Sequence, residues 1–134
     1  MASNRGLLHH VELYVSDLQR SVEFWGWLLT ELGYEPFQTW ASGRSWRRGP
    51  TYIVLVQAAA RQLSPPYDRR RVGLNHLAFH AGSRAEVDRL SAELGRRGIH
   101  LLYPERHPRA GGEGGYAVYF EDPDRIKIEV TAAE

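Results

Sequence analysis

The feature that most constrains this chain is a pattern that occurs twice along it: an alternating strand, an amphipathic helix and then further strands. The first copy begins in the stretch HHVELYV and the second in NHLAFHA. His10 and His76 hold equivalent places in these stretches, about 66 residues apart, and Gly33 and Gly98 follow the two helices at nearly the same offset. An internal repeat of this kind indicates two copies of one supersecondary unit.

The start of each helix is signalled in the sequence. The first helix begins after Ser16 or Asp17, which are residue types that cap helix N-termini, and it ends before Gly33. The second begins at Ser83, with Glu86 three residues further on, as in a capping box. Both helices are amphipathic, so each is expected to cover one face of a sheet and to leave the opposite face free.

We predict one α+β domain over residues 1–134. Residues 7–60 form the first module and residues 73–132 the second, while the polar, proline-containing residues 61–72 link them. After its helix, the second module is expected to contain three strands, the first of them in IHLLYPERH at residues 99–107.

Composition excludes several classes of protein. The chain has 134 residues, of which 43% are hydrophobic, and its formal net charge of +1 does not favour a nucleic-acid partner. The absence of cysteine excludes disulfides, thiolate nucleophiles and cysteine metal ligands. No apolar run approaches the roughly 20 residues of a membrane span, and MASNRGLLHHVELY lacks the apolar core of a signal peptide. We therefore expect a soluble cytoplasmic protein with a small-molecule substrate and no membrane partner.

Three predicted strands share a polar side that faces away from the helices. Successive side chains of a strand alternate between its two faces, so the apolar set on the helix side defines the opposite set. That opposite set comprises His10, Glu12, Tyr14, His76, Ala78, His80, Lys127, Glu129 and Thr131. We call this side of each sheet the open face.

Two imidazoles and one carboxylate on the open face suit a divalent metal ion. Neutral histidine and carboxylate ligands bind Fe, Mn, Ni, Co or Zn, and three protein ligands leave positions for water and substrate. We therefore take His10, His76 and Glu129 as candidate metal ligands. The alternative from strand parity alone is that these are ordinary strand residues satisfied by hydrogen bonds.

Two further open-face residues are candidates for proton transfer. Glu12 is interpreted as a general base, as a residue that orients a ligand, or as the salt-bridge partner of Lys127. His80 is either a partner of His76 or a passive part of the wall.

Aromatic and apolar side chains on neighbouring strands are expected to line a substrate pocket, although the tryptophans also suit an ordinary core. These residues are Trp40, Trp46, Tyr52, Val54, Tyr116, Val118 and Phe120.

Three stretches resemble the signature stretches of the vicinal oxygen chelate superfamily: LLHHVELYVSDLQRSVEFWGWLLTELGY, LNHLAFHA and YAVYFEDPDRIKIEV. That superfamily includes glyoxalase I, extradiol dioxygenases, fosfomycin-resistance thiol transferases and bleomycin-binding proteins. The resemblance implies two βαβββ modules whose curled mixed sheets surround a central metal cavity, usually in a homodimer. It also implies that His10, His76 and Glu129 are the metal ligands.

The departures from the family pattern limit the assignment. Val54 stands where glyoxalase I has a fourth ligand, so three protein ligands are expected. The loop RAGGEGGYAV lacks the serine-containing potassium loop of the fosfomycin enzymes and the chain stops at Glu134, which disfavours that assignment. Single-chain extradiol dioxygenases usually have twice as many modules. Arg125 replaces the usual glycine after DPD, which is acceptable if this turn does not require a positive φ.

These observations favour a metal-dependent, glyoxalase-like lyase or isomerase that acts on a small oxygenated metabolite or its thiol adduct. Two alternatives stay open: an extradiol-type dioxygenase, and a metal-free protein that binds a drug or metabolite, as the bleomycin-resistance proteins do.

Overall fold

The structure is a computed structural model in which residues 3–133 are described. The chain divides into two compact units, Met1–Pro66 and Tyr67–Glu134, and the boundary falls inside the predicted linker at residues 61–72. We describe each unit by itself.

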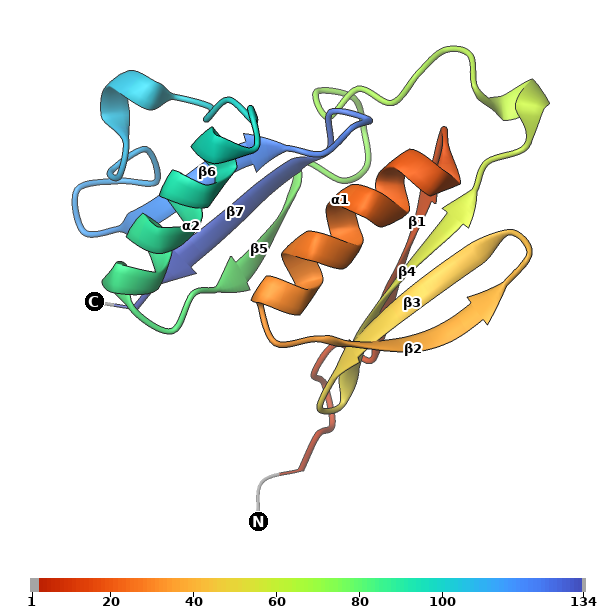
Figure 1. Cartoon of the computed structure of the whole chain (residues 1–134), viewed down its shortest axis with the longest axis horizontal. Coiled ribbons are helices and arrows are strands. Elements are labelled where there is room, and N and C mark those ends of the chain that lie inside the picture. The colour runs from red at the N-terminus through yellow and green to blue at the C-terminus, as the bar shows by residue number, and fades with distance from the viewer. Residues whose placement is uncertain (1–2, 134) are drawn as a thin grey trace. The chain divides into compact units, whose positions relative to one another are not determined.

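The first unit contains a four-stranded sheet in the order β1-β4-β3-β2, with α1 over one face (Figure 1). Strands β1 and β4 are parallel, whereas β3 is antiparallel to both of its neighbours. In chain order the elements are β1 (His10–Val15), α1 (Leu18–Glu31), β2 (Glu35–Trp40), β3 (Gly43–Arg48), β4 (Thr51–Gln57) and the short 3-10 helix η1 (Ala60–Gln62).

Helix α1 forms where the sequence predicts it. Asp17 is the N-cap, and its side chain accepts a hydrogen bond from the Arg20 N–H at 3.2 Å. Gly33 follows the helix with a φ of +88°, a conformation that glycine adopts without steric cost. The helix buries Trp25 together with two leucines, and these pack on the apolar side of the sheet, which includes Leu13, Val15, Ile53 and Leu55.

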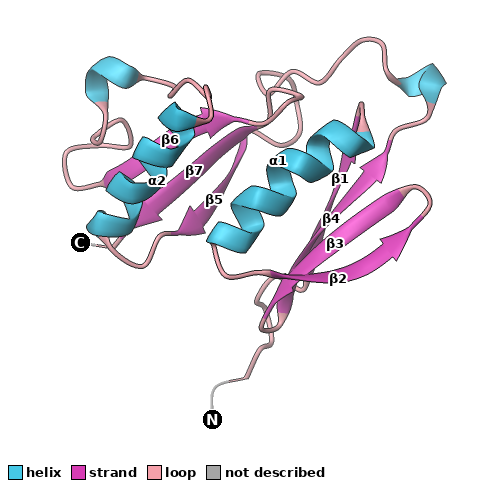
Figure 2. Cartoon of the chain, viewed as in Figure 1, coloured by secondary structure: helices cyan, strands magenta, loops and turns pink. Residues whose placement is uncertain are grey.

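The second unit contains a three-stranded sheet in the order β5-β7-β6, with α2 over one face (Figures 1 and 2). Strand β7 is parallel to β5 and antiparallel to β6. The elements are β5 (His76–His80), α2 (Arg84–Arg96), the 3-10 helix η2 (Pro104–Arg106), β6 (Tyr116–Glu121) and β7 (Lys127–Ala132). Ser83 caps α2 by accepting a hydrogen bond from the Glu86 N–H at 3.1 Å, as the predicted capping box requires.

The predicted strand at residues 99–107 is absent from the second unit, which therefore has one strand fewer than a βαβββ module. One backbone hydrogen bond from this segment reaches β6, from Leu102 N–H to the Tyr119 carbonyl at 2.8 Å. Tyr103 then adopts a left-handed conformation with a φ of 52°, and Pro104, which has no N–H, begins η2. These two residues end the extended pairing before a ladder can form.

Within residues 3–133 the strands form two separate mixed sheets and no closed barrel. The α+β class and the arrangement as two strand–helix–strand modules agree with the prediction. In the same described part of the chain, no helix is long and apolar enough to span a bilayer.

Candidate metal and substrate site

Two of the three predicted metal ligands lie together on the open face of the second sheet. His76 begins β5, and Glu129 lies on the adjacent strand β7, two residues beyond Lys127, which is the register partner of His76. The His76 Nε2 atom is 3.2 Å from the Glu129 Oε1 atom. Their side chains are 32% and 15% exposed, so the pair is partly shielded and still reachable from solvent.

The neighbouring asparagine fixes the orientation of the His76 ring. Its Oδ1 atom lies 2.7 Å from His76 Nδ1 and therefore accepts the proton of that nitrogen. In the neutral ring the lone pair then resides on Nε2 and faces a carboxylate oxygen, so two acceptors point at the same place. A cation suits that position, and a histidine whose second nitrogen is held by a protein oxygen is the usual form of a metal-bound histidine. The donor set in this unit thus fits a divalent ion.

Tyr119 completes the surroundings of Glu129, and the sequence analysis did not identify it. It pairs with Glu129 in the β6–β7 register, so both side chains lie on the same face. Burial raises the pKa of Tyr119 to about 12, and a hydrogen bond to Glu129 adds to this shift. A Cβ atom at Gly111 would lie 2.7 Å from the Tyr119 hydroxyl, so a larger residue there would require this hydroxyl to shift. The phenol therefore holds the carboxylate in place.

Lys127 has a hydrogen-bond partner within its own unit. Its Nζ atom donates to the Tyr103 hydroxyl at 2.9 Å. This hydrogen bond is the main reason why the pKa of Tyr103 is lowered, and the charges of Lys127, Arg69 and Arg106 lower it further.

The third predicted ligand, His10, lies on the open face of the first sheet among aromatic rings. It stacks on Tyr52, its register partner in β4, with ring centroids 4.6 Å apart and an angle of 4° between the ring planes. Its Nδ1 atom is 2.9 Å from Nδ1 of His9, a residue that the sequence analysis did not select. Phe37 contacts the other side of this cluster, edge to face with Tyr52 at 5.3 Å.

The candidate proton-transfer residues are exposed. Glu12 follows His10 by two positions on the same side of β1, and His80 lies at the end of β5 opposite Thr131. Among residues 3–133, no three histidine or carboxylate side chains lie close enough together to hold a metal ion. His76 and Glu129 belong to the second unit and His10 to the first.

Three of the predicted pocket residues lie on the open face of the first sheet. Tyr52 and Val54 share this face with their register partners His10 and Glu12, although Val54 is only 3% exposed. Trp40 pairs with Gly43 at the edge of the sheet, and its ring covers the space that a Cβ at this glycine would occupy.

The other four predicted pocket residues lie on the helix side of their sheets. Trp46 pairs with Ile53 on the helix side, and its ring lies 3.4 Å from the position of a Cβ on Gly26 in α1. Val118 and Phe120 are fully buried, and they pair with Val130 and Ile128 of the core. The hydroxyl of Tyr116 donates to Asp88 of α2 at 2.6 Å. All four therefore pack on the helix side, away from the candidate ligands of their own unit.

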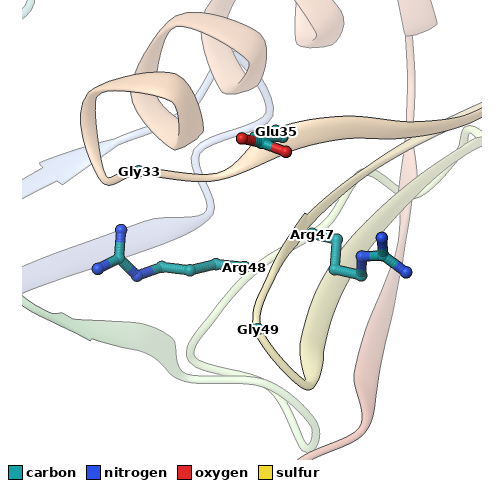
Figure 3. Close-up of a pocket in the computed structure, with 5 residues that line it drawn as sticks. All are labelled: Gly33, Glu35, Arg47, Arg48 and Gly49. Atoms are coloured by element: carbon teal, nitrogen blue, oxygen red, sulfur yellow. The ribbon is translucent and has the colours of Figure 1, made fainter.

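The first unit also has an open depression of about 560 Å³, which is separate from the predicted site (Figure 3). Its lining residues are Gly33, Glu35, Arg47, Arg48 and Gly49. In Figure 3 the Arg48 side chain extends toward Gly33, where its Nη1 atom donates to the Leu32 carbonyl at 3.0 Å. Arg48 thus binds a carbonyl at the C-terminal end of α1. In this position its side chain has a structural role, which is to stabilise the end of the helix.

Comparison with solved structures and curated proteins agrees with this architecture. A crystal structure of a candidate glyoxalase from Bacillus halodurans matches with a TM-score of 0.94 and 53% identity, covering 96% of this chain and 97% of that one. The uncharacterized protein YqjT of Bacillus subtilis (strain 168) is 57% identical over 93% of this chain and 98% of its own length.

Two similar proteins have names that refer to fosfomycin resistance or glutathione transfer. The glutathione transferase FosA of Serratia marcescens is 32% identical over 92% of this chain and 78% of its own length. A variant of the fosfomycin resistance protein FosX of Listeria monocytogenes, crystallised with Mn(II) and a dihydroxypropylphosphonic acid, has a TM-score of 0.68. It is 23% identical, covers 97% of this chain and 93% of its own, and so shows a shared fold.

The family assignment follows from the sequence itself. A model of the Glyoxalase/Bleomycin resistance protein/Dioxygenase superfamily matches residues 9–120, a range that includes His10, His76 and both helices. The chain belongs to the glyoxalase/bleomycin resistance protein/dioxygenase superfamily.

Proposed function

We propose that this protein is a divalent-metal-dependent enzyme of the glyoxalase type, a lyase or isomerase that acts on a small oxygenated metabolite or its thiol adduct. The observation that carries the proposal is the 3.2 Å approach of His76 Nε2 to Glu129 Oε1, with Asn75 holding the other ring nitrogen. In this proposal His10 is the third ligand, and the ion is Fe, Mn, Ni, Co or Zn. The Mn(II) bound to FosX supports a divalent ion in this superfamily.

The residues around the ligands have separate tasks in this proposal. A bound divalent ion supplies Lewis-acid polarisation of substrate oxygens. Tyr119 restrains the carboxylate of Glu129 by donating a hydrogen bond to it. Glu12 and His80 are the exposed open-face groups that would accept and return a proton, and Tyr52 provides an aromatic surface beside His10.

Metal binding tests the proposal directly. Protein stripped with a chelator is dialysed against each of the five metals, and the retained ion is measured by elemental analysis. We expect the wild type to retain a stoichiometric ion, whereas His76→Ala and Glu129→Gln lose it, because each removes one donor from the pair. His100→Ala, an exposed histidine of the same unit, is the matched control and should bind as the wild type does. A wild-type protein that retains none of the five metals would remove the proposal.

Glutathione transfer is the second candidate, since FosA is a glutathione transferase and is 32% identical to this chain. The two candidates differ in the reaction that the metal-loaded protein accelerates. Isomerisation of a glutathione hemithioacetal without net consumption of glutathione supports the lyase or isomerase. Consumption of glutathione with an epoxide substrate such as fosfomycin supports the transferase.

A further inference from the structure

The only lysine of the chain has an unusual environment. Lys127 is half-buried on the open face of β7, where its register partners are His76 in β5 and Glu121 in β6. Its Nζ atom donates to the Tyr103 hydroxyl at 2.9 Å and lies 5.0 and 5.3 Å from the ring centroids of Tyr103 and Tyr119. The ammonium group is thus held by a phenol and bordered by two aromatic rings.

No carboxylate within residues 3–133 forms an ion pair with Lys127. Its register partner Glu121 is instead paired with Arg69 and lies 3.5 Å from Arg125 Nε. Removing a cation from water without a counter-charge costs free energy, so a half-buried ammonium of this kind is well placed to receive an anion.

The charged side chains that act on Tyr103 are positive, like Lys127. The Arg106 guanidinium lies 5.0 Å from the Tyr103 ring centroid, and both Arg69 and Arg106 act on its hydroxyl through their charges. The Tyr103 hydroxyl accepts the hydrogen bond from Lys127, so its own proton is free to be donated to a ligand oxygen. A lysine and a tyrosine therefore present two donors to the same place.

We propose that Lys127 Nζ and the Tyr103 hydroxyl form a binding subsite for the oxyanion group of the substrate, a carboxylate or a phosphate. Lys127 is two residues from Glu129 on the same face of β7, so the subsite borders the candidate metal ligands of its own unit. The inference deepens the proposed function, on which it rests for the identity of the substrate. It restricts that substrate to an oxygenated metabolite with a fixed negative charge.

A single lysine allows a test without chemical modification. Protein labelled with [ε-13C]lysine gives one lysine signal in a carbon–proton correlation spectrum, and this signal reports on Lys127 alone. Chelator-treated protein is titrated with inorganic phosphate and, separately, with acetate. Sodium chloride at matched ionic strength serves as the reference, because bulk screening acts on every charge alike.

The expected result is a saturable shift of the Lys127 signal with phosphate and acetate, and none with chloride. Tyr103→Phe, which keeps the ring and removes the donor, should raise the apparent Kd about tenfold, as expected for losing a hydrogen bond to a charged group. Tyr14→Phe, an exposed tyrosine on the open face of the first unit, is the matched control and should leave the Kd unchanged. If Tyr103→Phe does not fold, a second comparison replaces this one. Phosphate should protect the wild type against thermal unfolding, and Lys127→Gln should lose this protection.

The inference is overturned if the lysine signal moves no more with phosphate and acetate than with chloride. It is equally overturned if Tyr103→Phe binds phosphate as well as the wild type does. Because no divalent metal is present, this outcome is independent of the metal-binding test. If the wild type retains none of the five metals on dialysis but its Lys127 signal still shifts with phosphate, the proposed function is refuted and the subsite stands.

Discussion

At the scale of single residues, the second unit holds its candidate ligands by hydrogen bonds from side chains that no metal-ligand motif would include. Asn75 binds one nitrogen of His76, and Tyr119 binds Glu129. The sequence pointed to His76 and Glu129 through strand parity and family resemblance. It did not point to Tyr119, because residues 116–120 are aromatic or apolar on both faces of the strand. Without an alternation of polar and apolar residues, the sequence does not show which side chains face the helix.

We predict that Asn75→Ala lowers the affinity for a divalent metal by about 10-fold to 100-fold, because the His76 ring loses the acceptor that fixes its tautomer. Competition with a coloured chelator measures the affinity. Asn75→Asp keeps an acceptor and should restore most of the affinity, whereas Asn4→Ala, at the other asparagine of the chain, should have no effect. Equal affinities in Asn75→Ala and the wild type would show that this hydrogen bond does not orient a ligand.

The phenols of the two neighbouring tyrosines should titrate far apart. The hydrogen bond from Lys127 favours the phenolate of Tyr103 and lowers its pKa, while burial raises the pKa of Tyr119 to about 12. On raising the pH, the ultraviolet absorbance of phenolate should therefore rise first from Tyr103 and last from Tyr119. Tyr103→Phe should remove the earliest component, and Lys127→Met should move it to higher pH. An unchanged titration in Tyr103→Phe would contradict this order.

At the scale of elements, the face of β6 is decided by its pairing with β7. The register places Val118 and Phe120 beside core residues and Tyr119 beside Glu129. We predict that Phe120→Ala lowers the free energy of unfolding by about 3–5 kcal/mol, the usual range for emptying a core position of this size, and leaves metal affinity unchanged. Denaturant unfolding measures the first quantity and chelator competition the second.

The control for this prediction lies on the same strand. Tyr119→Phe removes a hydroxyl from the opposite face and should affect metal affinity more than it affects packing. If Phe120→Ala weakens metal or substrate binding while stability is unchanged, Phe120 is a wall of the substrate pocket and not a core residue.

The turn before β7 shows a second difference between expectation and structure. Arg125 has a φ of 70°, so the condition under which the sequence made arginine acceptable here, a turn without a positive φ, is not met. Asp122 explains how the turn accepts arginine, since its Oδ1 atom accepts hydrogen bonds from the Asp124 and Ile126 N–H groups at 2.8 and 2.7 Å. The surrounding hydrogen bonds hold the backbone in a conformation that a side chain disfavours.

We predict that Arg125→Gly raises the free energy of unfolding by about 0.5–1 kcal/mol. Relief of the left-handed strain gains about 1–2 kcal/mol, and the greater freedom of glycine in the unfolded chain offsets part of it. Arg125→Ala keeps the strain and loses only the exposed contact with Glu121, so it should be neutral or slightly destabilising. The midpoints of urea unfolding distinguish the two variants, and a glycine variant less stable than the alanine variant would contradict the explanation.

At the scale of the whole molecule, the candidate ligands come from two compact units, with His10 in one and His76 and Glu129 in the other. We predict that the protein is a homodimer, as the family resemblance implies, and that light scattering gives twice the mass of the chain. Mixing His10→Ala with His76→Ala protein then tests which chains supply each site. Metal retention restored by mixing shows ligands from two chains, while no restoration shows that each site is complete within one chain. A monomeric mass would refute the prediction of a dimer.

The sequence by itself determined the α+β class, the two-module repeat, both helix starts and the open-face alternation of β1, β5 and β7. These are local properties, since caps, glycines and alternating polarity act over a few residues. The tertiary structure decided what local patterns leave undefined. It ended the expected strand at residues 99–107 after one cross-strand hydrogen bond, and it assigned Trp46 and three β6 residues to the helix side. It also brought Tyr103, Tyr119 and Lys127 together, because strand register and long-range packing bring together side chains that are distant in the sequence.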